Sequence, residues 1–385
     1  MFFLPVGNYF HFHASVYVMG IPDCGPVMII FMERSKVMFT SRLDPGMSAG
    51  PFAFNERSVR PNPAYSSVIV PIPDRFTSLG LLRRIGWGST GDVFEIECDG
   101  KMALKVISGR NQPGRYQNAL HEAEILKLLE GVPGVVHLLD METRENHGLH
   151  TVYLLEEYAC PFMDSIKASG GMTKSHAMTM ILNVCSTLIA CREKDVMHLD
   201  LQPRNLFISD RGEALLGDFS CALRRSEIPD HPGPRGSLAF MAPEVFRGEG
   251  VSERSEIYSL GLHLYILFHE MSLPYYDRDS ELACYRRLAG MPVPPPSEHN
   301  ESETPGLYAL IARACAFHPG DRFPSFEAFR DAVVGTRREL ERAGHGDDWL
   351  PCDAEKLFFL ESTLPVSRIS GFPLMPEEDP FRTIQ

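Results

Sequence analysis

The residues best suited to chemistry form a short polar run at 198–205, followed by a Gly-Asp-Phe-Ser segment at 217–220. Asp200, Asn205 and Asp218 each place a side-chain oxygen in these two segments. Carboxylate and amide oxygens are hard ligands that suit Mg2+, with nucleotide oxygens and water completing the shell. A carboxylate beside them can orient a hydroxyl group for attack on a phosphate. The residue types are therefore suited to phosphoryl transfer from a magnesium-bound nucleotide.

A glycine-rich turn upstream, Gly-Trp-Gly-Ser-Thr-Gly-Asp-Val at 86–93, is the candidate for holding the phosphates. Glycine has no Cβ, so the backbone of such a turn can approach phosphate oxygens closely. Val93, at the end of the turn, would cover the adenine ring. A G-x-G-x-x-G pattern alone is more often an ordinary turn than a phosphate loop, so its weight depends on its context.

Lys105 follows the turn in a short apolar run, which would direct its side chain inward. An inward lysine needs a negatively charged partner. Glu122, in the helix predicted next, is the preferred partner, and Glu124 is the alternative on another face of that helix. Considered alone, Lys105 would more often be a surface residue whose ammonium reaches water.

The elements that must position these residues change in type along the chain. Residues 76–107 have short apolar runs separated by glycine, which predicts a twisted antiparallel sheet. Apolar spacing predicts an amphipathic helix at 118–130, and 151–157 reads as a strand. Long helices are predicted at 175–194 and at 253–271, the latter apolar on nearly every face and so buried in the centre of a second lobe. The change from strands to helices predicts a lobe boundary near 158–162.

The 385 residues suffice for one large two-lobed domain with tails, or for two modest domains. We predict an N-terminal extension at 1–75, loosely structured and with a linker at 48–63; the lobes would span 76–157 and 158–340, and a C-terminal tail 341–385. A proline-rich stretch at 292–296 is either a docking motif for a partner or, by preference, a surface loop.

Composition narrows the class of protein. The formal charge of −13, without a run of Lys and Arg, argues against direct nucleic-acid binding. The nine cysteines include no C-x-x-C pair and indicate reduced thiols rather than zinc ligands. The amino terminus lacks the positive lead of a secretory signal, and the apolar run at 27–32 is far shorter than the roughly 20 residues that span a bilayer. We therefore expect no membrane span and an intracellular, soluble protein.

Taken in order, these motifs resemble those of the eukaryotic-type serine/threonine protein kinases over roughly residues 76–335. Residues 86–93 resemble the glycine-rich loop, 102–105 the V-A-I-K strand and 198–205 the catalytic loop. Further matches are 218–220 to D-F-G, 236–244 to the segment ending in A-P-E, and Ser259-Leu260-Gly261 and Asp321-Arg322 to later landmarks. The departures described below resemble those of divergent kinases, including some encoded by large DNA viruses, for which the host cytoplasm or nucleus would be the location.

The resemblance implies an α+β, two-lobed fold, with a small antiparallel β-sheet N-lobe carrying one main helix and a larger, mainly helical C-lobe. It implies ATP and Mg2+ as cofactors. Asp200 would orient the substrate hydroxyl, Asn205 and Asp218 would hold magnesium, and Lys105 would bind the phosphates while paired with Glu122. The residues that would contact the nucleotide are Gly86, Trp87, Gly88, Ser89, Thr90, Gly91, Val93, Ala103, Lys105 and Phe207.

The resemblance also assigns supporting roles. His198 and Phe219 would pack beneath the site, and Glu244 would pair with Arg322 to anchor the peptide-binding segment. Whether Leu155 or Glu156 guards the nucleotide pocket stays open at this stage.

Four positions depart from the family pattern. Leu199 replaces the arginine that receives an activation-loop phosphate, so we predict activity that does not require phosphorylation of Ser226 or Ser237. Gln202 replaces a lysine, which predicts slower turnover unless Arg204 substitutes. Ser220 replaces the glycine of D-F-G, and Glu256 replaces a helix aspartate that braces the catalytic loop.

The sequence is compatible with three functions. The leading one is transfer of the γ-phosphate of ATP to Ser/Thr hydroxyls of protein substrates, since 236–240 resembles the G-T-x-x-Y form of these kinases. A pseudokinase scaffold is the alternative: the four departures favour it, and the joint retention of Lys105, Asp200, Asn205 and Asp218 opposes it. A small-molecule phosphotransferase is the third, opposed by the A-P-E segment. The physiological substrate and oligomeric state are not predicted.

Overall fold

A computed structural model of the chain describes residues 4–5, 14–19, 28–33, 36–39, 72–87, 91–98, 100–109, 113–146, 148–229, 233–276, 280–297, 306–353 and 356. The chain divides into two compact units, Met1–Asp74 and Arg75–Gln385. Each unit is described by itself.

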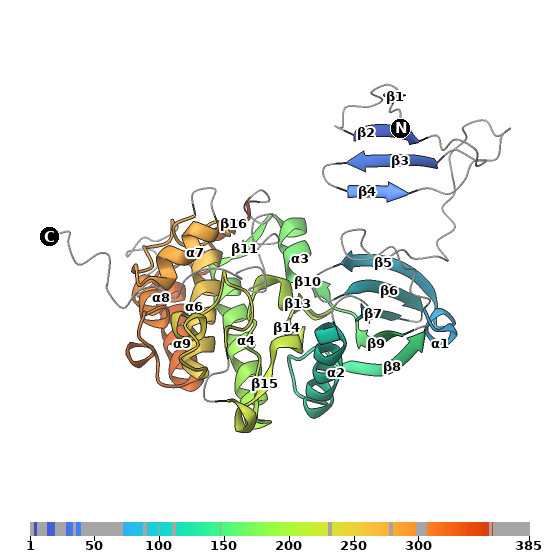
Figure 1. Cartoon of the computed structure of the whole chain (residues 1–385). Helices are drawn as coiled ribbons and strands as arrows, with labels where there is room; N and C mark the ends of the chain where they lie inside the picture. Colours follow the sequence, from blue (N-terminus) through green and yellow to red (C-terminus); the bar gives the residue numbers. More distant parts are fainter. Residues whose placement is uncertain are drawn as a thin grey trace. The chain divides into compact units, whose positions relative to one another are not determined.

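The first unit contains a four-stranded antiparallel sheet in sequence order (Figure 1). Its strands are β1 (Leu4–Pro5), β2 (Ala14–Met19), β3 (Met28–Glu33) and β4 (Lys36–Phe39). The strands β2 to β4 are rich in β-branched, Phe and Tyr residues, which favour strands. The N-terminal extension at 1–75 stays a prediction. The predicted linker at 48–63 lies outside the described residues.

The second unit begins inside the short helix α1 (Asp74–Thr77) and contains a five-stranded antiparallel sheet of order β5-β6-β7-β9-β8. The strands are β5 (Leu81–Trp87), β6 (Asp92–Cys98), β7 (Gly100–Ser108), β8 (Leu138–Asn146) and β9 (Leu149–Glu157). The helix α2 (Pro113–Leu128) packs on this sheet (Figure 1). It starts five residues before the predicted 118, because proline fits the first helical position, where no N–H bond is needed.

The larger lobe is mainly helical, as predicted (Figure 1). Its α-helices are α3 (Phe162–Ser169), α4 (Lys174–Glu193), α5 (Pro243–Phe246), α6 (Glu253–Leu267), α7 (Ser280–Leu288), α8 (Leu307–Ala314) and α9 (Phe326–Arg342). Its short strands are β10 (Cys160–Pro161), β11 (Gly171–Thr173), β12 (Val196–Met197), β13 (Leu206–Ile208), β14 (Ala214–Leu216), β15 (Leu223–Arg224) and β16 (Trp349–Pro351). Its 3-10 turns are η1 (Pro203–Asn205), η2 (Phe219–Cys221), η3 (Arg225–Glu227) and η4 (Pro319–Asp321).

The helix α6 forms the centre of this lobe, which confirms the prediction made from its apolar faces. Every residue from Ser255 to Leu267 is buried, and the helix packs against α4, α8 and α9. Ser252 and Ser255 cap its start reciprocally. The helix ends earlier than the predicted 271, because Glu270 and Met271 adopt positive φ angles of 47° and 61°, which a right-handed helix excludes.

Two short pairings bring the chemistry-bearing segments together. Strands β13 and β14 form a hairpin that links Asn205 to Gly217, and the Gly217 N–H donates to the Asn205 carbonyl at 2.9 Å. Strands β12 and β15 pair through Val196 with Arg224 and Met197 with Leu223. Because these strands flank the polar run and the Asp-Phe-Ser segment, both segments lie side by side.

Part of the C-terminal tail packs on the larger lobe. Strand β16 pairs with β11, and Lys174, which is 4% exposed, places Nζ 3.1 Å from Oδ2 of Asp348. Residues from 357 onward lie outside the described residues. Across the part of the chain that the structure describes, no helix combines the length and apolar character needed to cross a bilayer.

Candidate active site

The side chain of Lys105, on β7, joins the helix α2 to the start of η2. Its Nζ lies 2.8 Å from Oε1 and 3.0 Å from Oε2 of Glu122, and 3.2 Å from Oδ1 of Asp218. Lys105 is 6% exposed and Glu122 is 1% exposed, so their ion pair is almost fully removed from water. Glu124, the alternative partner, is exposed. The fold therefore gathers one ammonium and two carboxylates from three distant segments.

Burial and charge oppose each other in this cluster. Burial disfavours the ammonium of Lys105, but the carboxylates of Asp218 and Glu122 outweigh it and raise the pKa of Lys105. Burial raises the pKa of Glu122, and the Lys105 ammonium partly offsets this effect. Burial also disfavours the Asp218 carboxylate, but Lys105 outweighs it and lowers the pKa of Asp218. Lys105 thus stays cationic and Asp218 anionic at neutral pH, as phosphate and metal binding require.

The carboxylate of Asp200 accepts hydrogen bonds from three donors. Oδ1 accepts from the backbone N–H of Ser237 at 2.7 Å, and Oδ2 accepts from Nε2 of Gln202 at 2.9 Å and Nδ2 of Asn205 at 3.1 Å. Burial, together with the charge of Asp218, raises the pKa of Asp200 to about 6. A carboxyl group whose pKa lies close to neutrality is a suitable proton acceptor.

The backbone preceding Asp200 is held by Glu256 of α6. Its Oε1 accepts from the N–H of His198 at 2.8 Å and from the N–H of Leu199 at 3.1 Å. Leu199 has a φ of 62°, a left-handed conformation that is unfavourable for a residue with a side chain. The sequence left open whether Glu256 fits in place of the shorter aspartate; here it reaches both amides.

His198 packs beneath the site. Burial lowers its pKa to about 4, so the ring is neutral. Nδ1 accepts from the Asp200 N–H at 3.2 Å, which places the proton on Nε2, 3.0 Å from the Gly217 carbonyl. The ring meets that of Phe219 edge to face, with 4.6 Å between centroids. These contacts fix the backbone on both sides of Asp218.

The glycine-rich turn is described only in part. Gly88, Ser89 and Thr90 lie outside the described residues, while Gly86 and Trp87 end β5 and pair with Val93 and Asp92. At Gly91 the structure gives a second reason for glycine, because an added Cβ would lie 2.5 Å from the Val106 carbonyl oxygen. Close packing of β6 on β7 thus requires glycine there, independently of any phosphate.

Strand register shows which side chains share a face with Lys105. Lys105 lies opposite Val93 and Leu154, and Ala103, two residues earlier, lies opposite Glu156. Side chains two residues apart on a strand point to the same face. Glu156 therefore shares the face of Lys105, whereas Leu155 lies on the other. Burial raises the pKa of Glu156 to about 7, with Lys105 opposing the rise.

Phe207, the remaining residue predicted to contact nucleotide, lies half-buried on β13. Its ring packs against Gly217, where an added Cβ would lie 2.8 Å from Cε2 of Phe207. The ring thus lies beside the backbone that leads into Asp218.

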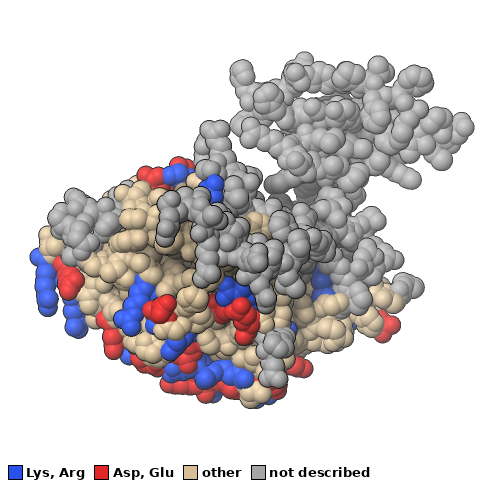
Figure 2. All heavy atoms as spheres, turned by 60° about the vertical axis from the view of Figure 1, so that its left-hand side comes forward, with Lys and Arg blue, Asp and Glu red and all other residues tan. Residues whose placement is uncertain are grey.

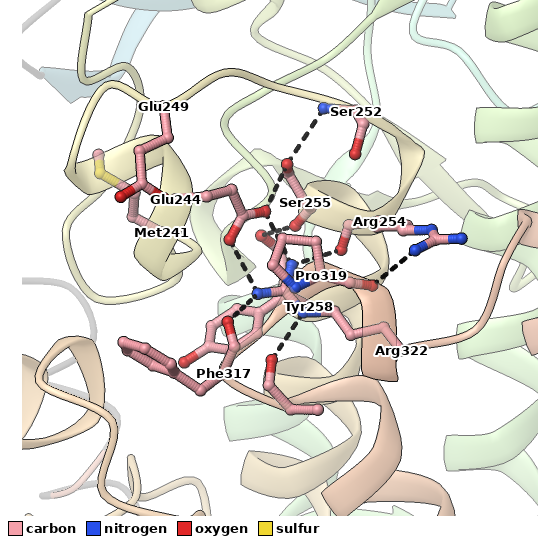
Figure 3. A network of polar contacts seen from close by, with 12 residues as sticks. Met241, Glu244, Glu249, Ser252, Arg254, Ser255, Tyr258, Phe317, Pro319 and Arg322 are labelled. Carbon is pink, nitrogen blue, oxygen red and sulfur yellow. Dashed lines mark hydrogen bonds and ion pairs between the residues drawn. The ribbon is translucent and has the colours of Figure 1, made fainter.

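The pair of Glu244 and Arg322 is present and bidentate, with Nη1 to Oε1 and Nη2 to Oε2 both at 2.8 Å. The Arg322 guanidinium also donates to the carbonyls of Arg254 at 2.9 Å and Phe317 at 3.0 Å, and through Nε to Ala316 at 2.7 Å. Figure 3 shows these bonds converging on Arg322, from which the ring of Tyr258 lies 4.6 Å. Arg322 is 2% exposed, so the pair is a buried clamp on the A-P-E segment.

Of the two candidates to replace the family's lysine, Gln202 and Arg204, only Gln202 bonds Asp200 among the described contacts. Arg204 is exposed. Gln202 is therefore the side chain that occupies the place of the replaced lysine. At the third departure, the N–H of Ser220 donates to Oδ1 of Asp218 at 3.4 Å.

One contributor was missed from the sequence: the Ser237 N–H that binds Asp200. A backbone donor cannot be read from residue types, and the neighbouring Gly236 was the available signal. The φ of Gly236 is 85°, and an added Cβ would lie 2.3 Å from the Leu199 carbonyl oxygen, so this position requires glycine.

The donor set fits a magnesium ion shared with a nucleotide. Nδ2 of Asn205 donates to the backbone and side-chain oxygens of Asp200, which leaves the amide oxygen as the atom for a cation. Asp218 retains Oδ2 beside the Oδ1 that Lys105 contacts. Within the described ranges no group of three or more His, Cys, Asp or Glu side chains is arranged to hold a metal. Two protein ligands are typical of Mg2+ bound with phosphates, rather than of a closed metal cage.

One family model and several known proteins match this chain. The family described as protein kinase domain matches residues 79–333. The serine/threonine-protein kinase PksC of Streptomyces coelicolor is 28% identical over 283 residues, which cover 70% of this chain and 50% of that protein.

Two further relatives have similar identities. PknB of Mycobacterium tuberculosis, a serine/threonine-protein kinase, is 26% identical over 77% of this chain and 47% of its own length. Pkn1 of Myxococcus xanthus, also a serine/threonine-protein kinase, is 30% identical over 67% of this chain and 38% of its own length. The chain thus spans about half or less of the length of these relatives.

Proposed function

This chain belongs to the protein kinase family, and we propose that it transfers the γ-phosphate of ATP to serine and threonine hydroxyls of protein substrates. The observation that carries the proposal is the contact of Lys105 with both Glu122 and Asp218. It joins the sheet, the helix α2 and the Asp-Phe-Ser segment in the arrangement that phosphoryl transfer in this family uses.

In the proposed reaction each residue of the site has a separate task. Lys105, oriented by Glu122, neutralises phosphate oxygens of ATP. Asp200, oriented by Gln202 and Ser237, accepts a hydrogen bond from the attacking hydroxyl and then its proton. Asn205 and Asp218 would hold Mg2+, which when bound supplies positive charge to the phosphates.

The place of the protein substrate follows from the segment that holds Asp200. Its hydroxyl would approach Asp200 beside the segment 236–241, whose Ser237 bonds that carboxylate. On the face of the molecule shown in Figure 2, Lys and Arg side chains alternate with Asp and Glu along the lower edge. Such mixed charge on the described residues of this face does not form the continuous basic surface that nucleic acid binding uses.

A transfer assay tests the proposal. Purified protein is incubated with labelled ATP, Mg2+ and a generic basic protein, alongside Lys105→Met and Asp200→Asn. Both variants should lose at least about a hundredfold in rate, because each removes a charge used at the transition state. Lys127→Met, an exposed position on α2, is the matched control and should retain the rate. Nucleotide binding without transfer would indicate a scaffold, and transfer only to a small metabolite would indicate another phosphotransferase.

A further inference from the structure

The helix α7 carries a buried arginine, Arg287, whose hydrogen-bond partners among the described residues are all neutral. Arg287 is 3% exposed, and its Nη1 donates to the Met241 carbonyl at 2.7 Å and to the Tyr258 hydroxyl at 2.6 Å. Its Nη2 donates to the carbonyls of Leu238 at 3.1 Å and Ala239 at 3.0 Å. Burial raises the pKa of Tyr258 to about 12, so this phenol is neutral as well.

A buried cation without a carboxylate partner is unfavourable unless its hydrogen bonds are well satisfied. Arg287 meets this condition through backbone carbonyls of one short segment, 238–241. The fork of the guanidinium suits this task, because its donors diverge in one plane and reach several acceptors at once. Among the described residues, Arg287 therefore holds the backbone of 238–241 through its carbonyls.

The same segment is anchored at both ends by the site already described. Before it, Gly236 packs against the Leu199 carbonyl, and the Ser237 N–H binds Oδ1 of Asp200 at 2.7 Å. After it comes Glu244, held by Arg322. The ring of Tyr258 contacts both guanidinium groups, at 5.2 Å from Arg287 and 4.6 Å from Arg322. The two arginines thus brace consecutive parts of one stretch of chain.

We propose that Arg287 is a positioning residue that holds the backbone of 238–241 and, through the adjoining Ser237 amide, the orientation of the Asp200 carboxylate. It does not touch the reacting atoms. The inference rests on the proposed function, since it assigns the segment 236–241 to the docking of the substrate and Asp200 to its hydroxyl. It adds a residue on α7 to the groups that set the rate.

Kinetics of Arg287→Lys and Arg287→Met test the proposal. Lysine keeps the charge but lacks the fork, and methionine removes every donor. We expect kcat to fall about tenfold in Arg287→Lys and further in Arg287→Met, with KM for a peptide substrate raised and KM for ATP within about twofold, because Lys105 and Glu122 are untouched. Arg286→Met, at the neighbouring half-buried position, is the control and should match the wild type. Equal losses in the Arg286 variant, or a kcat for Arg287→Met within about twofold of wild type, would overturn the proposal.

Hydrogen exchange separates this inference from the proposed function. The amide of Ser237 and those of 238–241 should exchange at least about tenfold faster in Arg287→Lys, whereas the amides of α4 and α6 should keep their protection, because the lobe remains folded. If wild-type protein transfers no phosphate, the proposed function is wrong, and these exchange rates still judge the role of Arg287. Unchanged protection of Ser237 would show that Arg287 does not hold the segment.

Discussion

The clamp between Glu244 and Arg322 supplies the sharpest prediction about stability. Its perturbation is Arg322→Met, which keeps most of the aliphatic volume and removes the guanidinium. Five hydrogen bonds are lost: two to Glu244 and one each to the carbonyls of Arg254, Ala316 and Phe317. The Glu244 carboxylate, 6% exposed, would keep its bond from the Ser255 hydroxyl at 2.7 Å.

The expected loss of unfolding free energy follows from the lost hydrogen bonds and the unpaired carboxylate. A buried ion pair that loses one partner leaves an uncompensated charge, which costs about 3 to 5 kcal/mol. The double variant Glu244→Gln with Arg322→Met removes that charge, so it should be less destabilised than the sum of the two single variants. A coupling free energy of about 2 kcal/mol is expected, since contacting groups in one network are not additive.

Urea unfolding of the four proteins measures this coupling. Arg338→Met, at an exposed position on α9, controls for loss of an arginine as such and should change stability by less than about 0.5 kcal/mol. A loss below about 1 kcal/mol in Arg322→Met, or additive effects in the double variant, would refute the reasoning that the clamp is buried and charged.

Three other predictions concern the loop around Asp200. Gln202→Ala should lower kcat about tenfold with KM for ATP unchanged, because the bond from Nε2 to Asp200 is lost; steady-state kinetics check this, and an unchanged kcat would show that Gln202 has no part in orienting Asp200. Gly236→Ala should lose at least about 2 kcal/mol of stability by thermal unfolding, because φ is 85° and the new Cβ would lie 2.3 Å from the Leu199 carbonyl oxygen. Gly320→Ala, where an added Cβ meets no atom within 4 Å, should lose far less. Equal losses in the two variants would contradict the close approach at Gly236. For Glu256, burial raises the pKa of the carboxyl group from 4.5 to about 7, so the folded state binds the carboxyl proton more tightly than the unfolded state does. The protonated carboxyl group therefore contributes to the free energy of unfolding in full below about pH 4.5, and this contribution is lost as the pH rises through 7. Glutamine cannot ionise, so the free energy of unfolding of Glu256→Gln, measured relative to that of the wild type, should rise by about 2 to 3 kcal/mol between pH 5 and pH 8. A difference between the two proteins that does not change with pH would contradict the buried position of the carboxyl group.

The sequence predicted those residues of the candidate site that are recognised by their side-chain type and their order along the chain. Lys105, Asp200, Asn205 and Asp218 were found by their motifs, and helical spacing ranked Glu122 above Glu124. The α+β, two-lobed fold followed from the same motifs and is confirmed, with the buried α6 predicted from its apolar faces. Each motif and each helix is defined by residues close together in the sequence, so a sequence pattern can predict it.

Features that depend on three-dimensional approach were beyond the sequence. Glu256 can bond the backbone amides of His198 and Leu199 only if α6 lies at the right distance from them. The spacing of residues along the sequence does not predict that distance. Gly91 was read as a phosphate-loop glycine, yet it is also required by the carbonyl of Val106 on a neighbouring strand.

The domain boundaries at 75, 157 and 340 stay predictions, as do the roles of the individual site residues. The match to the protein kinase domain covers 79–333, and the tail beyond α9 contributes at least the strand β16 to the larger lobe. Activity that does not require phosphorylation of Ser226 likewise stays a prediction. The Ser226 hydroxyl bonds Asp195, a contact that a phosphate would replace with repulsion between like charges.

The account depends most on Lys105, Asp200, Asn205 and Asp218 acting around one metal-bound triphosphate. A crystal structure with Mn2+ and a non-hydrolysable ATP analogue, with anomalous scattering to locate the metal, tests this directly. We predict a metal peak at about 2.0 to 2.2 Å from an oxygen of Asp218 and from the amide oxygen of Asn205, with phosphate oxygens beside Lys105 and Asp200 facing the terminal phosphate. A metal bound elsewhere, or an analogue that leaves Lys105 and Asp218 without contact, would contradict the account.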